Sequence, residues 1–147
     1  MKPSPTLLIF PDVNVWLALN HQIHVHHTAA MRWFAAQDES ATFVFCRQTQ
    51  MGFFRLMTTD AVLGSDVITQ CQCWAIYDRW IEDGKAILIG EPIGLEELFR
   101  LRTAEDSPSP KAWMDAYLAA FAEAENLILV TFDRALAGKA KGTVLLR

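Results

Sequence analysis

The chain has 147 residues, 52% of them hydrophobic, and a formal net charge of −4. This length suits one compact domain over residues 1–147, and the apolar run at residues 7–10 is too short for a membrane span or a signal-peptide core, so we expect a soluble, cytoplasmic protein. The acidic balance excludes a strongly basic surface but not a nucleic-acid partner, because setting aside three aspartates discussed below leaves 14 acidic residues against 13 basic ones.

Short apolar runs and helical patterns alternate along the first half of the chain. Residues 6–10 and 42–45 predict buried strands, whereas residues 13–19, 26–38 and 48–58 have the spacing of helices. Apolar residues then recur at Val67, Cys71, Trp74 and Ile81. This repeat predicts one long amphipathic helix over residues 65–82, ending at the following Asp-Gly pair.

The second half continues the alternation. Residues 86–89, 127–131 and 143–146 predict strands, residues 95–101, 113–124 and 134–137 predict helices, and the Ser-Pro repeat at 107–110 predicts a loop. Short, wholly apolar strands that alternate with helices are typical of a parallel sheet covered on both faces. The sequence therefore predicts a three-layer α/β/α domain with a central parallel sheet.

Three aspartates fall where such a sheet would gather them. Asp12 follows the first strand and Asp133 follows the strand at 127–131, so both belong at the carboxyl edge, where open α/β sheets bind ligands. Asp115 lies on a predicted helix and shares a face with the small apolar stripe at residues 118–122, which must pack against the sheet. A carboxylate on such a face needs a partner.

Taken singly, each aspartate has a simpler structural explanation. Asp12 and Asp133 suit the N-caps of the helices that follow them, and Asp115 suits the first turn of its helix. Taken together, three carboxylates at one edge, with no Lys or Arg beside them in the sequence, repel one another unless a hard cation holds them. Oxygen ligands favour Mg²⁺ or Mn²⁺ over zinc, and such an ion can activate water for phosphoryl chemistry.

Two polar residues are candidates to support this site. Asn14, two residues after Asp12, is placed to hold a metal-bound water or to orient that carboxylate, although it could equally stabilise the turn. Thr131, two residues before Asp133, shares its register at the strand edge and is expected to donate its hydroxyl to the carboxylates.

Four segments in this order carry a family resemblance: residues 8–16, LIFPDVNVW; 49–56, TQMGFFRL; 115–120, DAYLAA; and 130–134, VTFDR. Together they resemble the PIN-domain nucleases, and specifically the VapC toxins of bacterial toxin-antitoxin pairs. The resemblance implies Mg²⁺- or Mn²⁺-dependent cleavage of RNA, homodimerisation and inhibition by a small cognate antitoxin. It also implies that Asp12 and Asp115 are the principal metal-binding acids and that Asp133 supports them.

The chain departs from the family pattern at Gln50, where members commonly carry Glu. An amide can still coordinate through its carbonyl oxygen or orient a water, but it adds no negative charge. We therefore expect an acidic trio, lower metal affinity and one well-held metal ion rather than a pair.

Several other features invite a functional interpretation. The histidines lack the ligand spacing of a zinc site, and the cysteines lack a second pair, so we expect structural or surface roles for the former and reduced, core-filling thiols for the latter. Arg55 could contact RNA or stabilise the acidic site, and the C-terminal bases are expected to be solvated. These residues are His21, His24, His26 and His27; Cys46, Cys71 and Cys73; and Arg134, Lys139, Lys141 and Arg147.

Two alternative functions remain open from the sequence. Asp12 and Asn14 faintly resemble the Asp-x-Asp pattern of haloacid-dehalogenase-like phosphatases, although the second Asp is missing. A catalytically weak module that binds RNA or antitoxin is the other alternative, since Gln50 could have cost turnover. For the antitoxin, aromatic and Met side chains could form a groove, although core packing is the usual role of each. These side chains are Trp33, Phe53, Phe54 and Met57.

Overall fold

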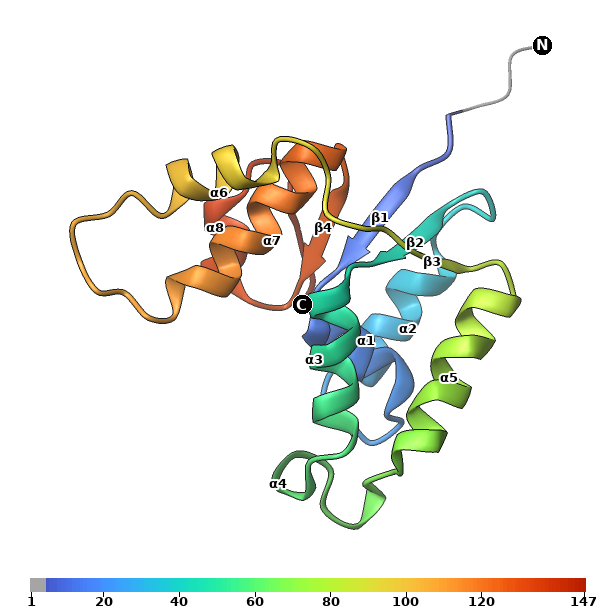
Figure 1. Cartoon of the computed structure of the whole chain (residues 1–147). Coiled ribbons are helices and arrows are strands. Elements are labelled where there is room, and N and C mark those ends of the chain that lie inside the picture. Colours follow the sequence, from blue (N-terminus) through green and yellow to red (C-terminus); the bar gives the residue numbers. More distant parts are fainter. Residues whose placement is uncertain (1–4) are drawn as a thin grey trace.

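The computed structural model describes residues 5–147, so the first four residues of the predicted domain lie outside it. Five parallel strands form one sheet in the order β3-β2-β1-β4-β5 (Figure 1). The strands are β1 (Leu8–Pro11), β2 (Thr42–Phe45), β3 (Ala86–Leu88), β4 (Ile128–Thr131) and β5 (Val144–Leu145).

Helices cover both faces of this sheet, which confirms the predicted three-layer fold. On one face lie α1 (Val13–Asn20), α2 (His27–Ala35), α3 (Arg47–Met57) and α5 (Gln70–Glu82). On the other lie α6 (Leu95–Arg102), α7 (Ala112–Glu125) and α8 (Arg134–Lys139). Within residues 5–147, no helix combines the length and apolar character that crossing a bilayer requires.

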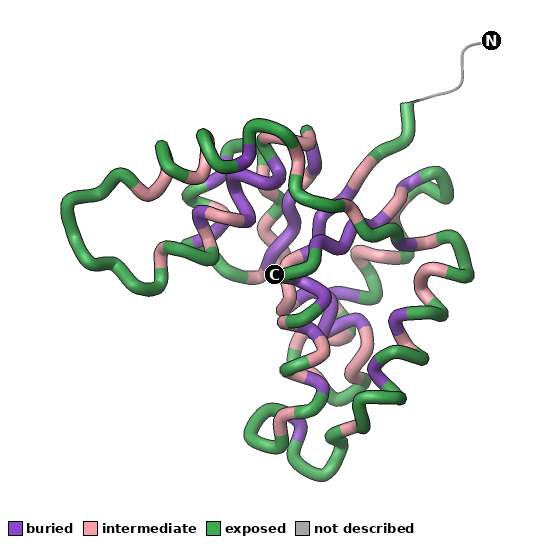
Figure 2. Tube along the Cα trace, viewed as in Figure 1, coloured by how far each residue is buried: buried purple, intermediate pink, exposed green. Residues whose placement is uncertain are grey.

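Neighbouring residues of each strand point into different cores, which explains why the strands are apolar throughout. Ile9 packs with α1 and its neighbours, whereas Phe10 packs against α7 and stacks on Phe121 at 5.2 Å between ring centroids. Phe43 and Val44 divide in the same way. Figure 2 shows the resulting band of buried residues between the two helical layers.

The larger core is organised around an aromatic cluster. Trp16, fully buried on α1, stacks on Phe45 of β2 with 3.8 Å between ring centroids and an interplanar angle of 10°. The ring of Trp80 on α5 meets Trp16 edge-on at 5.2 Å. These rings join α1, β2 and α5, so they hold α1 against the sheet.

The helix predicted over residues 65–82 is wrong in its first third. A short helix, α4 (Asp60–Leu63), and a 3-10 turn (Gly64–Asp66) come first, and α5 begins only at Gln70. The Thr69 hydroxyl accepts from the backbone N–H of Gln72, whose side chain accepts from the Thr69 N–H, and this capping box starts the helix.

The predicted apolar face of that helix is also wrong. The buried residues of α5 are Cys73 and Tyr77, whereas Val67 precedes the helix and Cys71 and Trp74 are exposed. Of the predicted face, only Ile81 packs against the core from within α5. Delaying the start of the helix changes which residues share a face. Cys71 therefore does not fill the core, although the other two cysteines are buried.

The order of the strands creates a crevice at one end of the sheet. The chain builds outward from β1 through β2 to β3 and then returns to place β4 on the other side of β1. Parallel sheets bind ligands at such a switch point, beyond the carboxyl ends of the strands. The residues that follow β1 and β4 are Asp12 and Phe132, so the predicted acidic edge falls at the crevice.

Replacing Trp16 tests the aromatic cluster as the anchor of α1. Trp16→Ala should lower the free energy of unfolding by about 3–5 kcal/mol, because it empties a fully buried aromatic site. Trp74→Ala is the matched control, since the Trp74 side chain is 47% exposed and its loss should cost clearly less. Urea denaturation followed by circular dichroism measures both, and equal losses would contradict the proposed anchor.

Candidate active site

Asp12 is held at the end of β1 by hydrogen bonds to its backbone and both side-chain oxygens. Its N–H donates to the carbonyl of Val130 on β4 at 2.8 Å, which continues the pairing of the two strands. Its Oδ1 accepts from the N–H of Val13 at 2.7 Å and caps α1, while its Oδ2 accepts from the hydroxyl of Thr131 at 2.8 Å. The carboxylate therefore has one fixed orientation, facing the crevice between β1 and β4.

Thr131 is the centre of a polar network that ties the two strand ends together. This side chain is fully buried, and its hydroxyl also accepts from the N–H of Asp133 at 2.9 Å. The Asn14 amide donates to the same hydroxyl at 3.5 Å, and its oxygen accepts from the N–H of Phe132 at 3.4 Å. Asn14 thus contacts the loop after β4 and reaches Asp12 through Thr131.

Asp115 lies in the first turn of α7 and has a cationic partner that the sequence did not reveal. The Lys139 ammonium, from the last turn of α8, lies 3.3 Å from Asp115 Oδ2. Arg102 donates to the backbone carbonyl of Lys139 at 2.6 Å and pairs with Glu123 at 3.0 Å, so the end of α8 is fastened to α6 and α7. Lys139 is exposed, as expected of a solvated base, but it is also paired with Asp115.

Asp133 caps α8 and also lies within electrostatic range of Asp12. Its Oδ1 accepts from the N–H of Ala135 at 2.8 Å and caps α8, as a simple N-cap would. It is nevertheless close enough to Asp12 for its negative charge to act on that carboxylate. Capping and membership of an acidic site are thus compatible at this position, as they are at Asp12.

The pKa of Asp12 reports the electrostatics of the crevice. Burial raises the pKa above its ordinary value of 3.8, hydrogen bonds from Thr131 and Val13 lower it, and the charges of Asp115 and Asp133 raise it again, with a net increase. The ionised carboxylate is therefore held at a cost in free energy. A bound cation would remove that cost.

The donor set fits a hexacoordinate hard cation better than a closed protein cage. Within the described part of the chain, no three His, Cys, Asp or Glu side chains are gathered closely enough to hold a metal ion by themselves. Mg²⁺ usually keeps several waters and takes one or two carboxylates plus substrate phosphates. An oriented Asp12 with two further carboxylates in electrostatic range is compatible with that mode of binding.

Gln50 lies on the buried face of α3 and is 1% exposed. Its carbonyl oxygen accepts from the Arg47 guanidinium at 2.6 Å, and its amide nitrogen has no hydrogen-bond partner in residues 5–147. Within residues 5–147, the hydrogen bond that the amide oxygen accepts thus comes from a cation. A Glu in this position would face the same arginine, so Arg47 would offset part of the charge that distinguishes Glu from Gln.

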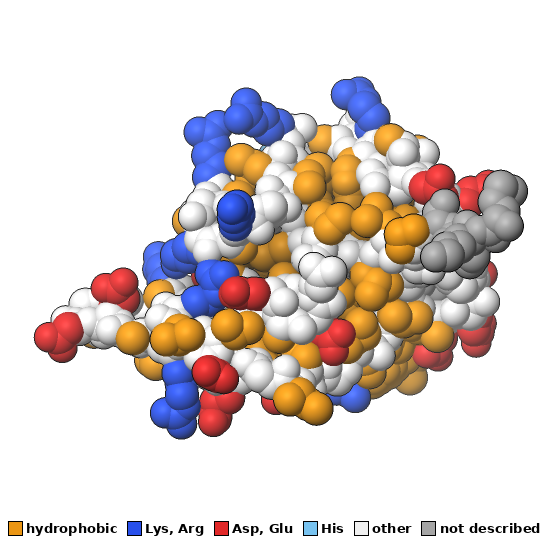
Figure 3. Space-filling model, turned by 90° about the horizontal axis from the view of Figure 1, so that it is seen from above, with side chains coloured by type: hydrophobic (Ala, Val, Ile, Leu, Met, Phe, Trp, Pro, Cys, Tyr) orange, Lys and Arg blue, Asp and Glu red, His pale blue; other side chains and the backbone are white. Residues whose placement is uncertain are grey.

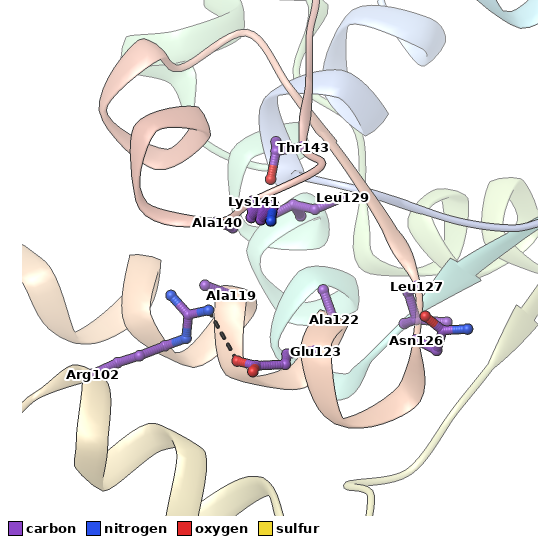
Figure 4. A pocket seen from close by; sticks show the side chains of 10 residues that line it. All are labelled: Arg102, Ala119, Ala122, Glu123, Asn126, Leu127, Leu129, Ala140, Lys141 and Thr143. Carbon is purple, nitrogen blue, oxygen red and sulfur yellow. Dashed lines mark hydrogen bonds and ion pairs between the residues drawn. The ribbon is translucent and has the colours of Figure 1, made fainter.

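A cavity of about 260 Å³ lies away from these acids, beside the amino end of β4 (Figure 4). It contains the pair between Arg102 and Glu123 and adjoins Thr143. A second cavity, of about 250 Å³, adjoins Asp12 itself and extends between α3 and α7. Of the two, only the second adjoins the acidic site.

Arg55 and the histidines complete the surroundings. Arg55 lines the cavity beside Asp12 and forms no ion pair within residues 5–147. His21 lies 3.4 Å from Asp66, the ring of His27 contacts the carbonyl of Ala18 at 2.7 Å, and the ring of His26 stacks on Phe132 at 4.4 Å. In the described chain the histidines build no metal site.

The face seen from above is not uniformly basic (Figure 3). In the view from above, Lys and Arg side chains gather mainly over the half formed by α6, α7 and α8, with acidic side chains among them (Figure 3). Of the four side chains considered for a partner groove, Phe53 and Met57 are buried in the core, whereas Trp33 and Phe54 are partly exposed. The prediction that these side chains could line a partner groove is therefore wrong for Phe53 and Met57.

Comparisons with known proteins agree with this geometry. The family model described as PIN domain matches residues 9–142. Ribonuclease VapC41 of Mycobacterium tuberculosis is 42% identical over 132 residues, which cover 87% of this chain and 90% of the relative, and Ribonuclease VapC44 of that species is 31% identical over 138 residues, covering 86% of each. The chain belongs to the PIN-domain family, within its VapC group.

A comparison of structures also places the fold among VapC toxins' folds. The crystal structure of VapC20 from Mycobacterium tuberculosis, a toxin that cleaves the sarcin-ricin loop, superposes with a TM-score of 0.63 at 15% identity, covering 88% of this chain and 93% of that one. At this identity the likeness establishes the shared fold. It confirms the parallel-sheet architecture that the sequence predicts.

Asp12→Asn tests whether the raised pKa reflects a site prepared for a cation. A raised pKa means that stability is lost as the pH rises from the ordinary Asp value through the folded-state value, so at neutral pH the ionised group destabilises the metal-free fold. Asn keeps one acceptor oxygen, which can still cap α1, and its amide nitrogen can donate to the Thr131 hydroxyl in place of the second oxygen. In the presence of a chelator, the variant should melt at a higher temperature than the wild type.

Added Mg²⁺ or Mn²⁺ should reverse that order, because only the wild type gains stability from binding the ion. Lys139→Met is the companion variant, since removing the ammonium from Asp115 should tighten Mn²⁺ binding in calorimetry. A metal-induced thermal shift of equal size in wild type and Asp12→Asn would contradict the assignment of Asp12.

Proposed function

We propose that this chain is a metal-dependent endoribonuclease, the toxin component of a type II toxin-antitoxin pair, with one nuclease domain over residues 1–147. The observation that carries the proposal is the fixed carboxylate of Asp12 at the β1–β4 crevice, under the charges of Asp115 and Asp133. Two of its relatives are named ribonucleases, and VapC20 is a toxin that cleaves an RNA loop. These names support the substrate class and the toxin role.

Asp12 and Asp115 would hold Mg²⁺ or Mn²⁺ as principal ligands, with Asp133 supporting them. When bound, the ion supplies an activated water and neutralises charge on the phosphate that is being attacked. The protein's part is to keep Asp12 ionised and oriented through the hydroxyl of Thr131, which Asn14 and the N–H of Asp133 hold in place.

The ammonium of Lys139 is a positive charge that the protein itself places beside Asp115. Before metal binds, its ammonium offsets the charge of Asp115 across 3.3 Å. With Asp115 engaged as a metal ligand, Lys139 would be available beside the site to contact the RNA phosphate. Gln50 leaves the trio with one well-held ion, and its role is confined to supporting α3 and to any water that its amide nitrogen orients.

We also propose a small cognate antitoxin, homodimerisation and a cytoplasmic location. Half-exposed apolar side chains support a protein partner, because contiguous apolar surface commonly marks an interface. Trp74, 47% exposed, and Phe54 line a cavity of about 350 Å³ between α3 and α5. This surface could receive the apolar face of a partner helix.

The proposed activity is tested by incubating the purified protein with structured RNA and Mn²⁺, with and without a chelator. Asp12→Asn and Asp115→Asn should each lower the cleavage rate at least about 100-fold, and Thr131→Val, which removes only the hydroxyl behind Asp12, about 10- to 100-fold. Asp78→Asn on α5 is the matched control and should cleave at the wild-type rate, because its side chain is exposed and α5 contributes no residue to the cavity beside Asp12.

Cleavage that persists in both aspartate variants would contradict the proposed site. RNA that is bound but never cut would favour the catalytically weak binding module. A burst of product with a phosphoryl-enzyme intermediate would favour the aspartyl-nucleophile phosphatase.

A further inference from the structure

We propose that the cavity between α3 and α7 is a nucleobase pocket, which receives one base of the RNA next to the phosphate that is cut. The inference rests on the proposed ribonuclease function and adds a specificity site to it. The first observation is the location of the cavity, because Asp12 itself forms part of its wall. A group seated there lies beside the carboxylate that would hold the metal, so it lies within one nucleotide of the reacting phosphate.

The floor of the pocket is rigid and apolar. Leu118 of α7 is buried, and α3 approaches α1 closely because Gly52 has no side chain. A Cβ at Gly52 would lie 2.8 Å from Cγ2 of Val13, which also lines the cavity. The floor is therefore formed where α3 packs closely on α1.

The rim is apolar and adaptable. Met51 on α3 and Met114 on α7 both line the cavity, and each is 49% exposed. Thioether groups make favourable contacts with aromatic rings and adjust to their shape. Two such side chains, coming from different helices, suit a flat aromatic ring better than a sugar or a phosphate.

Two polar side chains are placed to read or anchor the nucleotide. Gln48 and Arg55 line the same cavity, both are exposed, and neither side chain makes a hydrogen bond to another residue in the part of the chain that the structure describes. An amide can pair with the edge of a base, and a guanidinium can bind the adjacent phosphate or stack on a ring. Both groups are thus available without breaking an existing contact.

The size of the cavity favours a base over a protein segment. At about 250 Å³ it is smaller than the range of about 300–1,000 Å³ that is usual for drug-sized ligands. One ring system fits that space, whereas a helix needs a longer groove. RNA that is recognised by sequence commonly offers unstacked single bases of this kind.

The test uses methyl-labelled methionine and NMR in the presence of Mg²⁺, with the four nucleoside 5′-monophosphates and ribose 5-phosphate as probes. At least one nucleotide should shift the methyl signals of Met51 and Met114 by ring current and bind about tenfold more tightly than ribose 5-phosphate, equivalent to about 1.4 kcal/mol. The signal of Met31, which is on α2 and does not line the cavity, should not move.

Substitution of the rim provides the control. Met51→Gln combined with Met114→Gln should abolish the tenfold preference, Met51→Leu with Met114→Leu should keep most of it, and Met31→Gln should leave it unchanged. The Gln changes fall on half-exposed positions, and an unchanged signal from the buried Met57 shows that the fold is retained.

Equal binding of nucleotides and ribose 5-phosphate would overturn the pocket, and so would unchanged nucleotide preference in the double Gln variant. Either result leaves the ribonuclease proposal standing if the wild type still cuts RNA. If the wild type bound bases selectively but showed no metal-dependent cleavage of RNA, the proposed function would be overturned and the pocket would stand.

Discussion

The hydrogen bond from the Thr131 hydroxyl to Asp12 joins the ends of β4 and β1, and the geometry of the candidate site depends on it. Both residues follow from the pairing of the two central strands, which places Pro11 beside Val130 and brings the next residue of each strand to the same edge. Because Thr131 is fully buried, its hydroxyl cannot exchange its partner for water. The register of β1 and β4 thus determines how the Asp12 carboxylate is oriented.

That orientation is maintained against an electrostatic cost. Burial and two neighbouring carboxylates oppose the ionisation of Asp12, while two hydrogen bonds favour it. Lys139 offsets the charge at Asp115 but does not contact Asp12. The fold therefore contains a negative site that is incompletely compensated by its own residues, which is the physical condition that a divalent cation relieves.

Much of this could be predicted from the sequence because it depends on local patterns. The wholly apolar strands predicted a parallel sheet between two helical layers. Asp12 and Asp133, which lie one and two residues beyond strands, predicted an acidic site at the carboxyl edge of that sheet. The start of α5 depended on a Thr69 capping box within an otherwise continuous apolar repeat. The Lys139 partner of Asp115 is 24 residues away, and only the packing of α8 on α7 brings the two together.

Mn²⁺ located by its anomalous scattering in crystals of the wild-type protein tests the central claim most directly. We predict a peak in the crevice between β1 and β4, in direct contact with the Asp12 carboxylate and lost in Asp12→Asn. A peak confined to the histidines at residues 21–27, or an equally strong peak at the crevice in both proteins, would contradict the assignment of Asp12 as the residue around which the site is built.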